Sequence, residues 1–190
     1  MLPMTTSEPI TTAAETAPEI GVGIVTYNSA DHISDLIRTL RETLEGFSHR
    51  IVVADNASED TTVAQLEDAG IEVVRMGSNR GYSAGINACL RSLADARAVL
   101  ILNPDIKLGS GSVSALLAAL DDPRVGVVAP QSRDYGGGLG LTQRRDPSLL
   151  RAVGTTVLGG RYSRRFAALS EFVADEQSYL HARNIHWGVG

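Results

Sequence analysis

Short apolar runs alternate with amphipathic segments over the first two thirds of the chain, and this alternation limits the folds open to it. The runs are rich in β-branched residues and are typical of strands buried on both faces; they lie at 20–26, 51–54, 71–75, 99–102 and 125–129. Between the first two runs, apolar side chains recur at helical spacing, at Ile33, Leu36, Ile37, Leu40 and Leu44. Strands that alternate with helices predict an α/β fold, with a parallel sheet and helices on both faces.

The expected helices have recognisable starts and ends. We expect Asp31 to cap the first helix, and we expect the second to run from Ser58 to Asp68 and close at Gly70. Ser83 is the expected cap of a third helix, whose predicted buried face is Ile86, Cys89, Leu90 and Leu93. A fourth helix is predicted from Ser112 to Leu120.

The 190 residues are enough for one sizeable core. Residues 1–19 are acidic, without apolar periodicity, and are predicted to be a disordered tail; residues 20–130 form the expected α/β domain. Residues 131–190 are less regular. Six arginines against one acid occupy 144–165, and we expect a solvated loop there, with contact to lipid headgroups or phosphates as the alternative; the arginines are Arg144, Arg145, Arg151, Arg161, Arg164 and Arg165.

Charge and cysteine content exclude several classes of protein. A net charge of −5 argues against a nucleic-acid partner, because such binding needs a broad positive face. Cys89 is the single cysteine, so an internal disulfide and a cysteine-cluster metal site are excluded. The sequence shows neither a signal peptide nor an apolar run long enough to span a bilayer, and we expect a cytoplasmic protein.

Polar residues follow each predicted strand, where open parallel sheets bind their ligands. They are Thr26, Tyr27 and Asn28 after the first strand, Asp55, Asn56 and Ser58 after the second, and Asn103 and Asp105 after the fourth. Tyr27 offers a face for stacking a base, or is an ordinary loop aromatic. Asp55 accepts hydrogen bonds from a base or ribose on one interpretation, and begins a turn on the other.

Two further motifs suit a diphosphate and its cation. The segment 79–87 combines Asn79, Arg80, Gly81 and Asn87 around a helix N-terminus, the backbone arrangement that favours anions. Asn103-Pro104-Asp105 places a carboxylate beside an amide, oxygen ligands of the kind that Mg²⁺ or Mn²⁺ prefers. The alternatives are a capped loop in the first case and a Pro-Asp turn without an ion in the second.

Taken in chain order, four stretches resemble the family-2 glycosyltransferases of the GT-A fold, particularly their rhamnosyltransferase-like branch. The stretches are 25–28 (VTYN), 53–61 (VADNASEDT), 79–87 (NRGYSAGIN) and 102–105 (LNPD). The resemblance implies a Rossmann-like three-layer α/β/α fold with a mainly parallel sheet. It also implies that Tyr27 and Asp55 hold the base and ribose, and that Asp105 is the ligand of a divalent cation, with Asn103 at the first position of the family's Asp-X-Asp motif.

The resemblance further implies a reaction. A sugar, with rhamnose as the expected one, would pass with inversion from a dTDP- or UDP-sugar to a glycan or polyprenyl-linked acceptor, in cell-envelope polysaccharide synthesis at the inner face of the membrane. Similar proteins carry the general base after the segment matching 186–190, where this chain ends. We therefore expect the acceptor part, 131–190, to be incomplete, and the chain to bind a nucleotide sugar with little turnover.

Two other functions compete with this one. A nicotinamide-dependent enzyme would need Gly-x-Gly-x-x-Gly after the first strand, but Gly21 and Gly23 lie inside that strand and Thr26 stands at the third position. A non-catalytic module that binds a nucleotide sugar is the other alternative.

Overall fold

The structure is a computed structural model that describes residues 17–134, 136–163, 166–173, 175–185 and 187–188. The chain forms two compact units, Met1–Val113 and Ser114–Gly190, and each is treated by itself below. No helix in these described ranges has the length and apolar content needed to cross a bilayer.

The first unit holds most of the regular structure. Its elements are β1 (Ile20–Thr26), α1 (Ala30–Thr43), β2 (His49–Asp55), α2 (Thr62–Asp68), β3 (Glu72–Arg75), α3 (Tyr82–Ser92) and β4 (Ala98–Leu102). The helix α4 (Ser112–Leu120) crosses the boundary, and the second unit holds β5 (Gln143–Arg144), α5 (Leu149–Ser163), the 3₁₀ helices η1 (Ala167–Leu169) and η2 (Glu176–Tyr179), and β6 (Trp187–Gly188).

A parallel four-stranded sheet forms the centre of the first unit, in the order β3-β2-β1-β4. All seven residues of β1 are buried, as the apolar run predicts. The register pairs Thr26 with Asp55, and Ile24 with Leu102. The carboxyl ends of β1, β2 and β4 therefore lie at one edge of the sheet.

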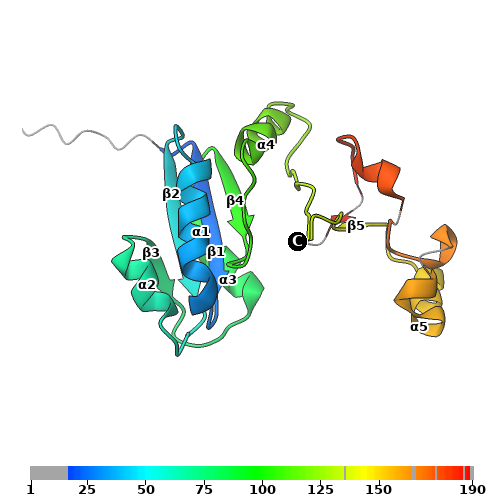
Figure 1. The fold of residues 1–190 in the computed structure, drawn as a ribbon, viewed down its shortest axis with the longest axis horizontal. Coiled ribbons are helices and arrows are strands. Elements are labelled where there is room, and N and C mark those ends of the chain that lie inside the picture. Colours follow the sequence, from blue (N-terminus) through cyan, green and yellow to red (C-terminus); the bar gives the residue numbers. More distant parts are fainter. Residues whose placement is uncertain (1–16, 135, 164–165, 174, 186, 189–190) are drawn as a thin grey trace, which may run out of the picture. The chain divides into compact units, whose positions relative to one another are not determined.

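Helices cover both faces of this sheet, as expected. Helix α1 lies over one face in Figure 1. On the other face, Gly23 lets α3 approach, because a Cβ there would stand 2.9 Å from the Cβ of Cys89. Gly21 has the same role beside Leu93, at 3.1 Å. The glycines of β1 thus serve close helix–strand packing, which explains why they lie inside the strand.

Cys89 reports on this packing. Its side chain is fully buried in a cluster with Val52 and Ala54, and burial raises the pKa of its thiol. Because the thiolate is the reactive form, we expect an aromatic disulfide reagent to label the native chain at least about tenfold more slowly than the urea-unfolded chain. The labelling rates are measured by absorbance. Equal rates for the native and the unfolded chain would contradict the packing of α3 against β1 and β2.

One predicted strand is wrong. Residues 125–129 have an apolar run like that of β4, but they adopt no regular structure, and Val127 is 88% exposed. In the described chain they pair with no strand. An apolar run becomes a strand only when a neighbour satisfies its backbone hydrogen bonds.

Three predicted helix starts are also wrong. Ser29, not Asp31, precedes α1, and Asp31 lies in its first turn. Helix α2 begins at Thr62 rather than near Ser58, because Ser58 and Asp60 hydrogen-bond to other segments. Gly81 precedes α3 with φ +83°, so Ser83 lies inside that helix. Leu90, predicted to be buried, is 40% exposed.

The arginine-rich window is not the predicted loop. Helix α5 occupies Leu149–Ser163, with a kink at Gly159, where φ is +71°. Gly154 packs against η1, since a Cβ there would lie 2.7 Å from the carbonyl oxygen of Leu169. Arg164 and Arg165 lie outside the described residues.

The prediction of a disordered tail is wrong at its end, where Pro18 and Glu19 are held by hydrogen bonds. Residues 1–16 lie outside the described part of the chain. Pro18 and Glu19, predicted as its end, accept backbone hydrogen bonds at 3.2 Å from Arg97 and Ala98. Glu19 also forms an ion pair of 3.1 Å with Arg97. These contacts fasten the segment before β1 to the start of β4.

Candidate nucleotide site at the carboxyl edge of the sheet

Asp55 is the most enclosed of the predicted site residues. Its side chain, only 3% exposed, ends β2. One carboxylate oxygen accepts hydrogen bonds from the hydroxyls of Thr26 (2.9 Å) and Ser58 (2.5 Å), and the other accepts one from the Ser58 amide (2.9 Å). A carboxylate offers about four acceptor positions. These three bonds fix its orientation and leave it acceptor capacity for a ligand.

The turns beside Asp55 have unusual backbone conformations. Asn28 (φ 48°) and Ala57 (φ 66°) are the two non-glycine residues with positive φ in the described chain. Two hydrogen bonds hold Asn28 in this conformation. Its backbone N–H donates to the Ser58 hydroxyl, and its side-chain oxygen accepts from the backbone N–H of Glu59. Such conformations persist only where neighbours enforce them, and they concentrate at functional sites.

Asn56 fixes the loop before α3. This buried residue donates from its side-chain nitrogen to the Gly81 carbonyl at 3.2 Å and accepts from the Arg80 amide at 3.4 Å. The side chain of Asn79 accepts from the Gly81 amide at 3.1 Å. The structure therefore brings Asn56, Asn79, Arg80 and Gly81 together, and Asn56 positions the loop through contacts within the protein.

The other predicted contacts on this side are exposed. Tyr27 is 52% exposed, and the side chains of Arg80 and Asn87 are exposed too. No ion pair involves Arg80 within the described ranges. Its guanidinium is thus available to an anion.

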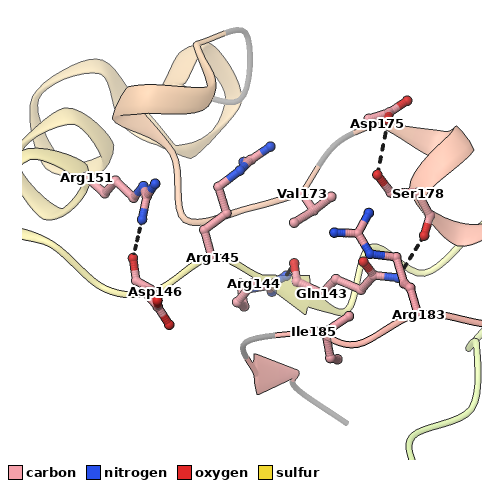
Figure 2. Close-up of a pocket in the computed structure, with 10 residues that line it drawn as sticks. All are labelled: Gln143, Arg144, Arg145, Asp146, Arg151, Val173, Asp175, Ser178, Arg183 and Ile185. Carbon is pink, nitrogen blue, oxygen red and sulfur yellow. Dashed lines mark hydrogen bonds between the residues drawn. The ribbon is translucent and has the colours of Figure 1, made fainter.

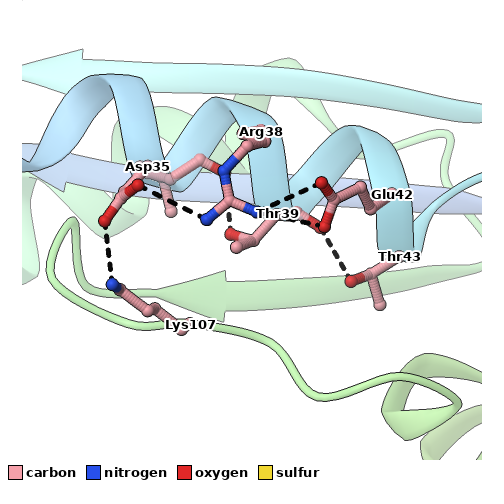
Figure 3. Close-up of polar contacts among 7 residues, drawn as sticks. Asp35, Arg38, Thr39, Glu42, Thr43 and Lys107 are labelled. Atoms are coloured by element: carbon pink, nitrogen blue, oxygen red, sulfur yellow. Dashed lines mark hydrogen bonds and ion pairs between the residues drawn. The ribbon is translucent and has the colours of Figure 1, made fainter.

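Asn103 and Asp105 follow β4, on the other side of β1 from Asp55. Asn103 is half-buried, and Asp105 is exposed. The segment after β4 is held by an ion pair, shown in Figure 3. Lys107 reaches α1 and pairs with Asp35 at 2.8 Å. Hydrogen bonds from Lys107 and, to a smaller extent, from Arg38 lower the pKa of Asp35. This pair anchors the residues that follow Asp105 to the first unit.

A pocket of about 390 Å³ opens beside Asp55. Of the predicted site residues it includes Asp55 and Ser58, and its wall adds Asp60, Arg75 and Gly77, which the sequence reasoning missed. Arg75 ends β3 in register with Asp55, so the strand-end rule itself would have found it. Asp60 accepts from the amides of Ala30 and Thr62, and its hydrogen bond with Thr62 lowers its pKa.

Comparison with proteins of known function bears on this arrangement. A curated relative, the N-acetylglucosaminyl-diphospho-decaprenol L-rhamnosyltransferase of Mycobacterium tuberculosis, is 31% identical over 148 residues. The match covers 71% of this chain and 48% of the relative, so the chain spans about half the length of that enzyme.

Solved structures share the fold. The S. aureus protein TarS (residues 1–349), in complex with UDP-GlcNAc, superposes with a TM-score of 0.57 at 21% identity, over 67% of this chain and 38% of that one. The Pyrobaculum calidifontis mannosyltransferase PcManGT, in complex with GDP-Man and Mn²⁺, gives a TM-score of 0.54 at 24% identity, over 63% and 37%. The expected GT-A fold is confirmed.

The family itself follows from the sequence match. The model of glycosyl transferase family 2 matches residues 21–179, which include β1 from its second residue, β2 to β4 and every predicted site residue. This chain belongs to glycosyl transferase family 2.

Proposed function

We propose that this chain binds a nucleoside diphosphate sugar at the carboxyl edge of its sheet, as the donor-binding part of a glycosyltransferase. The buried carboxylate of Asp55 in the wall of a pocket is the observation that carries the proposal. Three internal hydrogen bonds fix this carboxylate in place, so it is preorganised to accept a hydrogen bond from a pyrimidine N–H or a ribose hydroxyl. The exposed Arg80 beside the N-terminus of α3 suits the diphosphate.

The substrates belong to the same proposal. The relative at 31% identity is named for rhamnosyl transfer to a diphospho-decaprenol acceptor, which supports a dTDP- or UDP-linked donor and a polyprenyl-linked acceptor here. Transfer with inversion is the stereochemistry that we propose. Residues 20–130 would hold the donor, and residues 131–190 would belong to the acceptor side.

A divalent cation fits the residues after β4. No group of three or more His, Cys, Asp or Glu side chains gathers in the described chain, so an ion held here would need oxygens from the ligand. Mg²⁺ and Mn²⁺ bind in this way, through one or two carboxylates and substrate phosphates. Asp105, which is exposed and lies two residues after the half-buried Asn103, is the proposed ligand. When bound, the ion would neutralise charge on the departing nucleoside diphosphate.

Calorimetric titration with UDP and dTDP tests this proposal. We expect Mn²⁺ to strengthen binding, and the change Asp105→Asn to weaken binding in Mn²⁺ by about tenfold, because the ion loses its one protein carboxylate. In EDTA, the variant and the original chain should bind alike.

Asp95→Asn is the matched control, because Asp95 is an exposed aspartate before the amino end of β4. This variant should bind UDP as the original chain does. Equal effects of the two changes would reject Asp105 as the metal ligand. Binding of NADH in place of UDP and dTDP would reject the proposed function.

A further inference from the structure

The second unit contains a pocket that the donor site does not use. Its volume is about 440 Å³, and four arginines and two aspartates stand in its wall: Arg144, Arg145, Arg151, Arg183, Asp146 and Asp175. Figure 2 shows that Arg145, Arg151 and Arg183 come from three segments: the residues directly after β5, the first turn of α5 and the segment before β6. A surplus of positive charge from separate segments indicates an anionic ligand.

Two of these arginines are fixed by the protein. Arg144 stacks on the ring of Phe172 at 4.0 Å and donates to the Leu141 carbonyl at 2.6 Å. Arg145 donates to the carbonyls of Ser170 and Phe172. Contacts of Arg144 with a ring and with carbonyls hold its guanidinium in place without neutralising its charge. The charge therefore still contributes to the field inside the pocket.

The other two arginines have unused donors. Arg183 is exposed, and the described residues give it no hydrogen bond or ion pair. Arg151 donates to the Asp146 carbonyl at 2.5 Å, but its Nε atom is buried without an acceptor in the described part of the molecule. Because this Nε is closed to solvent, a ligand in the pocket would meet Arg151 at its Nη2 atom, which is not buried and makes no hydrogen bond to the described residues.

The two carboxylates of the wall offset only part of this charge, because four guanidinium groups stand against them. Asp175 accepts from the amide of Gln177 and the hydroxyl of Ser178 at the start of η2. Within the described ranges, Arg144, Arg151 and Arg183 form no ion pair. The pocket is therefore positive, and guanidinium groups match the geometry of phosphoryl oxygens.

We propose that this pocket binds a diphosphate group, with Arg151 and Arg183 donating to it and Arg144 supplying a fixed positive charge. A diphosphate carries more charge than one carboxylate and has oxygens on two phosphorus atoms, so arginines from two segments can bind it together. The diphosphate would come either from a prenyl diphosphate acceptor or from free diphosphate. Only the acceptor assignment rests on the proposed function.

Titration with inorganic diphosphate, without metal, tests the pocket. We expect Arg183→Gln to weaken binding by about tenfold, the effect of losing one charge-assisted hydrogen bond. Arg124→Gln is the matched control, because Arg124 belongs to the same unit and lies outside the pocket. The control should bind as the original chain does. Circular dichroism should be unchanged, since Arg183 is exposed.

Three results would overturn the proposal: equal losses in the two arginine variants, equal affinity for citrate, or a loss of diphosphate binding in Asp55→Asn. UDP binding distinguishes the two sites, because it should fall in Asp55→Asn and not in Arg183→Gln. If UDP binds and diphosphate does not, the donor proposal stands and this one fails. Geranyl diphosphate identifies the source, since tighter binding than inorganic diphosphate supports an acceptor lipid, and weaker or equal binding rejects it.

Discussion

Replacing Asp55 with Asn will weaken UDP binding by about tenfold to a hundredfold, the effect of losing one hydrogen bond to a charged group. The amide keeps the size of the side chain but has one acceptor oxygen instead of two. Two hydroxyls and a backbone amide donate to the native carboxylate, and the single oxygen cannot satisfy all three. The side-chain nitrogen of asparagine is a donor, so it cannot accept a hydrogen bond from the N–H or hydroxyl of a ligand.

A control variant separates this effect from the loss of a negative charge. Asp68→Asn removes an exposed carboxylate at the end of α2, outside the pocket. Calorimetry should give it the UDP affinity of the original chain. Ser58→Ala should have an intermediate effect, because it frees the carboxylate from one hydroxyl but keeps its charge. An Asp55→Asn variant that folds and binds UDP normally would remove Asp55 from the site.

Replacing Gly85 with Leu will destabilise the first unit by about 3 kcal/mol, the upper range for overpacking a core. Gly85 lies in α3 against β1, and a Cβ there would stand 2.7 Å from Cγ1 of Val25. Val25 is short, branched and buried, so it cannot move aside as a long side chain would. Helix α3 must shift, and the shift also moves Gly81, whose carbonyl Asn56 contacts.

Urea unfolding followed by circular dichroism measures this loss. Gly85→Ala should lose less, because alanine favours the helix by about 1 kcal/mol over glycine and adds one carbon atom. Combining Gly85→Ala with Val25→Ala should recover stability relative to the sum of the single changes, since the clash disappears. Additive losses in the double variant would show that Gly85 and Val25 do not meet.

Local patterns of apolar residues predicted the strands of the sheet and the helices that pack on it. The prediction for β1 matches the structure, because a buried parallel strand needs a continuous apolar run, and α4 matches at both ends. The run at 125–129 is likewise apolar and rich in valine, but it is no strand, because pairing depends on a neighbour far along the chain. Apolar runs thus indicate where strands can form, while tertiary contacts decide which of them do.

The site was predictable in part for the same reason. Asp55 and Ser58 follow from the strand-end rule, and both line the pocket. The contact of Asn56 with Gly81 joins residues 25 positions apart, and no spacing in the sequence indicates it. Arg145 donates to the Ser170 carbonyl, which is also 25 positions away. Because the sequence does not indicate this long-range contact, the arginine-rich window was predicted to be a solvated loop.

An NMR titration of the isotope-labelled chain with UDP, with and without Mn²⁺, tests the central claim most directly. We predict that UDP shifts the amide signals of Asn28, Ser58 and Arg80, which lie around Asp55 and the loop before α3. Adding Mn²⁺ should then broaden the signals of the residues that follow β4, around Asp105. Shifts confined to the second unit, or no shifts with any nucleotide, would contradict a donor site at the carboxyl edge of this sheet.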